Sequence, residues 1–146
     1  MDMPPVNPSP GAGAPSLPND IQLQHKFMAD VATFMTDMEA VIANPSDPYA
    51  TAAKKLCNDG VALQNDLTNL TKGSHADDQM AFNFNQSMGL SVQGQWNTLL
   101  GHCYTDQGSP WPGDVIQDLT GNPPNGFGTD ACNQILGGLR QFLKSM

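Results

Sequence analysis

The stretch QMAFNFNQSMGLSVQGQWNTLLGHCYT, residues 79–105, contains no Asp, Glu, Lys or Arg. Seven apolar residues recur in and around it at helical spacing: Met80, Phe84, Met88, Val92, Trp96, Leu99 and Cys103. This pattern predicts a helix with one apolar stripe. The outer face of a solvated helix normally carries charge, so we expect the stretch to be covered on most sides, by its own domain or by another molecule. Its many Asn and Gln residues exclude a membrane span.

Two further helices are predicted before this stretch. The first is expected over about 20–44, since Pro45 disfavours helical geometry at the residue before it, and the second from Ser46 or Asp47 to Gly73. Both carry apolar residues at alternating spacings of four and three, which is typical of helices packed at a shallow angle. These are Phe27, Val31, Phe34, Met38 and Val41 in the first, and Tyr49, Ala53, Leu56, Gly60, Leu63, Leu67 and Leu70 in the second.

The third helix should begin at Ser74, which is a good N-cap, and Gly89 predicts a kink or a split within it. A Pro/Gly-rich loop follows, in which residues 114–119 are expected to form a short helical turn. The last helix is predicted over about 130–145, capped by Thr129 or Asp130.

These elements predict an all-α fold, a bundle of about four main helices with a long Pro/Gly loop before the last one. Residues 20–146 are expected to form a single helical domain, since a chain of 146 residues can bury a core of its own. Residues 1–19 are expected to form an extended leader, because six prolines deny them a helix. The spacing of Pro5 and Pro8 matches PxxP, so the leader is interpreted either as a flexible segment or as a ligand for another chain.

Composition excludes some classes of partner. The net charge of −8 and the six scattered cations argue against nucleic-acid binding, which needs a basic patch. Charged residues make up only 14% of the chain, against about 25% in an average domain, so much of the surface should be polar but uncharged. No secretory signal peptide is evident, so the chain is expected to be cytoplasmic, secreted by another route, or already processed.

Motifs for catalysis are not evident. His102 and Cys103 are adjacent, and side chains next to each other on a helix project about 100° apart, which suits a zinc site poorly. Cys57 and Cys132 lie far from Cys103 in sequence. The three cysteines are interpreted either as small buried residues or as one disulfide and a free thiol. No catalytic, cofactor-binding or metal-binding residue is predicted, and an enzyme that uses Cys103 or a pair of Asp residues is the least favoured function.

The sequence therefore favours a non-enzymatic structural subunit that assembles with itself, as in a secreted filament or a virion. The alternative is a small acidic module that binds another protein, of the chaperone, immunity or inhibitor kind. Trp111, between two prolines, is interpreted either as a plug over the end of the bundle or as an exposed anchor for a partner. The residues expected to form an interface are Pro5, Pro8, Phe82, Phe84, Trp96 and Trp111.

Overall fold

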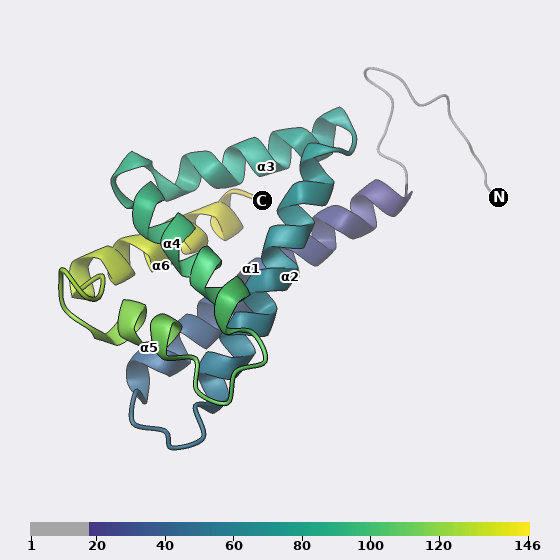
Figure 1. The fold of residues 1–146 in the computed structure, drawn as a ribbon. Helices are drawn as coiled ribbons and strands as arrows, with labels where there is room; N and C mark the ends of the chain where they lie inside the picture. Colours follow the sequence, from purple (N-terminus) through teal and green to yellow (C-terminus); the bar gives the residue numbers. More distant parts are fainter. Residues whose placement is uncertain (1–17) are drawn as a thin grey trace.

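The computed structural model describes residues 18–146, with side chains from Ile21 onward, and Figure 1 shows their arrangement. No strand occurs among these residues, which confirms the predicted all-α class for this part of the chain. None of the helices described there is both long and apolar enough to cross a membrane. The helices are α1 (Pro18–Ala43), α2 (Thr51–Thr71), α3 (His75–Met88), α4 (Gln93–Asp106), α5 (Gly113–Thr120) and α6 (Thr129–Ser145), with a short 3-10 turn, η1 (Leu90–Val92), between α3 and α4.

Six α-helices stand where about four main ones were predicted, for two reasons. The uncharged stretch does not form one helix, because Gly89 adopts a positive φ of 75° and the chain turns through η1 before it restarts as α4. This confirms the predicted split near Gly89. The second reason is α5, where only a turn was expected. Its start is fixed by Asp106, whose carboxylate accepts hydrogen bonds from the backbone N–H groups of Asp114 (3.0 Å) and Val115 (3.2 Å).

The start of α2 was predicted wrongly. It begins at Thr51, because the carboxylate of Asp47 accepts hydrogen bonds from the N–H groups of Tyr49 (3.0 Å) and Thr51 (2.9 Å). These bonds hold a turn ahead of the helix, and Ala50 takes a left-handed conformation with φ of 49°. Asp47 therefore stabilises the turn that precedes α2 and is not itself part of the helix.

The predicted caps of α3 and α6 have different outcomes. Ser74 caps α3 as expected: its hydroxyl accepts from the N–H of Asp77 (3.1 Å), and the carboxylate of Asp77 accepts from the N–H of Ser74 (3.2 Å). This reciprocal pair is a capping box. The predicted side-chain cap of α6 is wrong, because the N-cap residue is Gly128 and no side chain bonds to that helix end.

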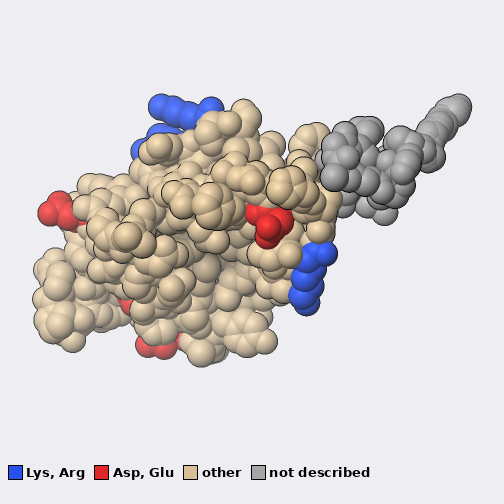
Figure 2. All heavy atoms as spheres, turned by 90° about the horizontal axis from the view of Figure 1, so that it is seen from above, with Lys and Arg blue, Asp and Glu red and all other residues tan. Residues whose placement is uncertain are grey.

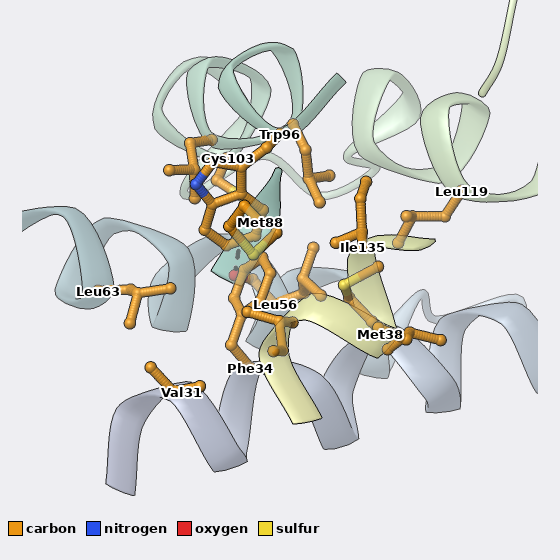
Figure 3. Close-up of a cluster of buried hydrophobic side chains, with 14 of the residues drawn as sticks. Val31, Phe34, Met38, Leu56, Leu63, Met88, Trp96, Cys103, Leu119 and Ile135 are labelled. Carbon is orange, nitrogen blue, oxygen red and sulfur yellow. Dashed lines mark hydrogen bonds between the residues drawn. The ribbon is translucent and has the colours of Figure 1, made fainter. Parts of the chain in front are cut away.

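The core joins four helices through five aromatic rings. Phe27 and Phe34 come from α1, Phe84 from α3, Trp96 from α4 and Phe142 from α6, and none is more than 2% exposed. Most of the neighbouring rings meet edge to face, with centroids 5.1 Å apart for Phe27 and Phe84 and 5.5 Å apart for Phe34 and Trp96. Figure 3 shows Phe34 and Trp96 packed among the aliphatic side chains of the same core. The apolar stripes predicted from helical spacing therefore point inward, except at Tyr49, which precedes α2 and is 74% exposed.

Helices α1 and α2 contain a repeat that the sequence reading did not identify. Lys26, Asp30 and Asp37 have the spacing Lys-x3-Asp-x6-Asp, and Lys55, Asp59 and Asp66 repeat it 29 positions later. The same shift places the core residues of α1 on positions of α2 that are apolar or glycine. The two helices lie side by side in opposite directions (Figure 1), and their ion pairs cross between them, Lys26 to Asp66 and Lys55 to Asp37. The hairpin thus has an approximate two-fold symmetry.

Replacing each of the two adjacent glycines in α6 with alanine should change the stability of the fold in opposite directions. A Cβ at Gly138 would lie 2.9 Å from the carbonyl oxygen of Ser87 and 3.0 Å from the sulfur of Met88, so α3 and α6 would have to separate. Gly137 meets nothing within 4 Å. We expect Gly138→Ala to lower the free energy of unfolding by about 1–3 kcal/mol, and Gly137→Ala to raise it by about 1 kcal/mol through helix propensity. Urea denaturation measures both, and a shift of the same sign in the two variants would contradict this packing.

Candidate functional site

Within residues 79–105, the outer sides of α3, η1 and α4 form an exposed surface without Asp, Glu, Lys or Arg. Its most exposed apolar residue is Leu90, at 93%, which η1 presents outward at the corner between the two helices, and Phe82 and Tyr104 are 55% and 60% exposed. We call this the uncharged surface. Its exposed residues include Gln79, Phe82, Asn85, Gln86, Leu90, Gly94, Asn97, Gly101 and Tyr104.

The described chain covers only the inner stripe of the uncharged stretch. Figure 2 looks down on the side where α3 lies and shows few Lys, Arg, Asp or Glu side chains there. Covering by its own domain was one of the two expectations, and it does not hold for this outer face. A solvated helix face usually carries charge, so the absence of charge here is the feature of the surface that calls for an explanation.

Two of the predicted interface residues are corrected by the structure. Phe84 is 0% exposed and Trp96 is 2% exposed, because α1 and α6 pack over the apolar stripe to which both belong. They are core residues of the single chain. Phe82 lies on the opposite side of α3 and stays exposed. Pro5 and Pro8 lie outside the described residues.

Trp111 is half exposed, at 49%, in the loop between α4 and α5. Ser109 shapes this loop: its hydroxyl accepts a hydrogen bond from the N–H of Trp111 (3.2 Å) and donates one to the carbonyl oxygen of the same residue (3.0 Å). Of the two interpretations, the plug does not fit a side chain with half of its surface open. Trp111 belongs to neither α3, η1 nor α4, so it is separate from the uncharged surface as defined above.

The three cysteines are free and buried, which confirms the first of the two interpretations. Cys103 donates from its sulfur to the carbonyl oxygen of Leu56 at 3.8 Å. The neighbouring thiol of Cys57 and burial both raise the pKa of Cys103, so its thiolate is disfavoured. A buried thiol of this kind is a poor nucleophile.

The repeat in α1 and α2 builds two Lys–Asp–Asp clusters. In one, the ammonium group of Lys26 lies 2.7 Å from Asp30 and 3.0 Å from Asp66. In the other, Lys55 lies 2.7 Å from Asp59 and 3.4 Å from Asp37. The central carboxyl group of each cluster is almost fully buried, since Asp66 is 3% and Asp37 is 5% exposed.

Each buried carboxyl group has a raised pKa, because burial disfavours its ionised form. Burial, and then a hydrogen bond with Asp59, raise the pKa of Asp37 to about 7; burial and Asp30 do the same to Asp66. In each cluster one buried carboxyl oxygen, Oδ2 of Asp37 or Oδ2 of Asp66, has no hydrogen-bond partner.

A further pair of polar side chains joins α4 to α5. Nδ1 of His102 lies 2.6 Å from the carboxylate of Asp118, which is 4% exposed. Burial lowers the pKa of His102, but the hydrogen bond to Asp118 and the charges of Asp114 and Asp106 outweigh it and raise the pKa above its usual value. Sequence reasoning missed this pair, because Asp118 lies beyond a loop whose path the sequence does not reveal.

Comparisons with protein-family models, curated proteins and solved structures find no match to this chain. Among residues 18–146, no group of three or more His, Cys, Asp or Glu side chains is placed to hold a metal ion. The features from which function can be inferred are therefore the uncharged surface, the two Lys–Asp–Asp clusters and the His102–Asp118 pair.

Proposed function

We propose that this protein is a non-enzymatic structural subunit that assembles with copies of itself through the uncharged surface. The observation that supports this most is the exposure of Leu90 (93%) and Phe82 (55%) on helices that carry no charge between Asp78 and Asp106. Burying apolar area stabilises an association by about 25 cal/mol per Å². Large exposed apolar side chains with uncharged neighbours are the composition expected at the centre of such an interface.

Charge favours a second copy as the partner at this surface. The chain carries a net charge of −8, so two copies repel each other over most approaches. The uncharged surface is where this repulsion is smallest. A basic partner would be attracted to acidic faces instead, and gains nothing electrostatic from this one. Two copies that meet through the same patch form a symmetric dimer, which is the commonest closed arrangement.

Glycines on the outer side of α4 support the same proposal. A Cβ at Gly94 or at Gly101 would meet nothing within 4 Å, so the packing of the single chain does not need glycine there. Each glycine costs a helix about 1 kcal/mol relative to alanine. A helix of a second copy could approach closely at these positions.

The acids of the described chain support an acidic binding module less well. Most of them already accept a hydrogen bond or form an ion pair within the chain, so fewer of their oxygens are free to bind another protein. The acids with such partners are Asp30, Asp37, Glu39, Asp47, Asp59, Asp66, Asp77, Asp106 and Asp118.

Charge placed on the uncharged surface should prevent assembly. We expect the molar mass of the full chain, measured by light scattering, to rise above the 15.6 kDa of one chain as concentration increases. Leu90→Asp should hold it at one chain, because each interface would then bury two unpaired carboxylates. Tyr49→Asp is the matched control, since Tyr49 is 74% exposed but lies in the loop before α2. A wild-type chain that stays monomeric at every concentration, or loss of assembly in Tyr49→Asp alone, would refute the proposal.

A further inference from the structure

A cleft of about 550 Å³ lies between α4, the end of α5 and the loop that follows α5. Its polar lining includes Gln95, Thr98, His102 and Asn125, and its apolar lining includes Pro123 and Phe127. Cavities of about 300–1,000 Å³ with apolar walls and a few convergent polar groups are typical of small-molecule sites. The cleft borders the uncharged surface, because Gly94 belongs to both, but His102, Asn125 and Phe127 of the cleft are not among the residues on which the proposed self-assembly rests.

The loop wall of the cleft is held in place by backbone bonds. The N–H of Phe127 donates to the carbonyl oxygen of Asp118 at 2.9 Å, and the N–H of Gly128 donates to the carbonyl oxygen of Gly121 at 3.1 Å. A Cβ at Gly126 would lie 2.4 Å from the carbonyl oxygen of Gln117, so only glycine fits where the loop folds back on α5. The wall is thus tied to the residue that orients His102, and the lining is preorganised.

Asp118 fixes which nitrogen of His102 can take a proton. An ionised carboxylate is only an acceptor, so Nδ1 of the imidazole carries the hydrogen that bridges the 2.6 Å contact. Nε2 of the neutral ring then keeps its lone pair, in a side chain that is 34% exposed and lines the cleft. A histidine oriented by a buried carboxylate in this way is a strong hydrogen-bond acceptor for a hydroxyl group.

The charges around the cleft select against anions. The lining includes Asp118 and no Lys or Arg, and Asp106 and Asp114 add negative charge near His102, so an anion is disfavoured. Gln95, Thr98 and Asn125 offer uncharged donors and acceptors, and the rings of Pro123 and Phe127 offer flat apolar faces. Sugars combine hydroxyl groups with apolar ring faces in this manner.

We propose that the cleft binds a neutral, hydroxyl-rich small molecule of sugar size, one hydroxyl of which donates to Nε2 of His102. The amide of Asn125 and the hydroxyl of Thr98 contact its other polar groups, and Phe127 packs against a ring face.

The test is an NMR titration of the full chain with glucose, N-acetylglucosamine and sucrose, each to about 50 mM, which fills most of a site of millimolar affinity. We expect saturable shifts confined to amides of residues 94–102 and 123–127 and to the ring of His102. His102→Gln should weaken binding about tenfold, as the loss of one good hydrogen bond does. His75→Gln, at an exposed position of α3, should bind as the wild type does.

Asn125→Ala provides a second variant that leaves the His102–Asp118 pair intact, in case His102→Gln does not fold. It should weaken binding severalfold, because it removes one amide contact. The proposal is overturned if none of the three sugars moves the resonances of the cleft. It is equally overturned if a small alkylammonium ion moves them and the sugars do not, or if Asn125→Ala binds as tightly as the wild type.

Discussion

Trp96→Ala should lower the free energy of unfolding by about 3–5 kcal/mol, the usual cost of removing a large aromatic side chain from a core. Trp96 is 2% exposed, and its ring centroid lies 5.5 Å from that of Phe34 and 5.7 Å from that of Phe84. Its removal leaves a cavity between α1, α3 and α4 that these rings can fill only in part. Since domains of this size are stable by only about 5–15 kcal/mol, the variant should lose a large share of its stability.

Trp111→Ala is the matched control for this prediction. It deletes the same side chain from a loop where the residue is 49% exposed, so we expect a cost below about 1.5 kcal/mol. Urea denaturation followed by circular dichroism compares the two, because it does not depend on which tryptophan remains. Equal costs at the two positions would mean that Trp96 does not occupy the centre of the core.

The free energy of unfolding should fall as pH rises from about 4 to about 7. Asp37 and Asp66 have pKa values of about 7 in the folded chain, raised first by burial and then by their neighbouring carboxyl groups. An unfolded Asp has a pKa of about 3.9. A group whose pKa is raised on folding stabilises the fold fully below its unfolded pKa, and this stabilisation is lost as pH rises through the folded value. His102 and Asp118, whose pKa values are also raised, act in the same direction.

The size of this loss should be several kcal/mol, because each unit of pKa shift corresponds to about 1.4 kcal/mol. The double variant Asp37→Asn with Asp66→Asn should flatten the profile, since an amide keeps a donor for the neighbouring carboxylate but does not ionise. Asp78→Asn, at an exposed position of α3, should leave the slope close to that of the wild type. Urea titrations at a series of pH values measure the slope. A free energy of unfolding that rises steadily from pH 4 to pH 7 would contradict the raised pKa values of Asp37 and Asp66.

Helical spacing identified the core stripes because it depends only on local geometry. Phe27, Val31, Phe34, Met38 and Val41 were predicted as one stripe of the first helix, and all five are buried. An apolar stripe indicates which face of a helix is buried. It does not identify the element that covers this face, because helical spacing depends only on the helix itself. For this reason Phe84 and Trp96 were predicted at an interface with another molecule, whereas α1 and α6 of the same chain cover them.

Contacts between α1 and α2, and contacts between helices joined by long loops, were not predicted from the sequence. The Lys–Asp–Asp clusters left a signal, because Lys-x3-Asp-x6-Asp occurs at Lys26 and again at Lys55. This repeat is hard to recognise, because few other residues are identical after the shift of 29 positions. Each Asp taken alone would be interpreted as a solvent-exposed acid. The His102–Asp118 pair left none, because its geometry depends on the path of residues 107–112. The sequence predicted a segment without charge, but it did not reveal that the outer side of this segment is exposed.

Hydrogen–deuterium exchange of the full chain at low and at high protein concentration tests the central claim most directly, because it locates any contact between copies. Assembly through the uncharged surface predicts that exchange slows with concentration at α3, η1 and α4, and that Leu90→Asp abolishes this difference. Exchange that is independent of concentration everywhere, or protection confined to the α1–α2 hairpin, would contradict it.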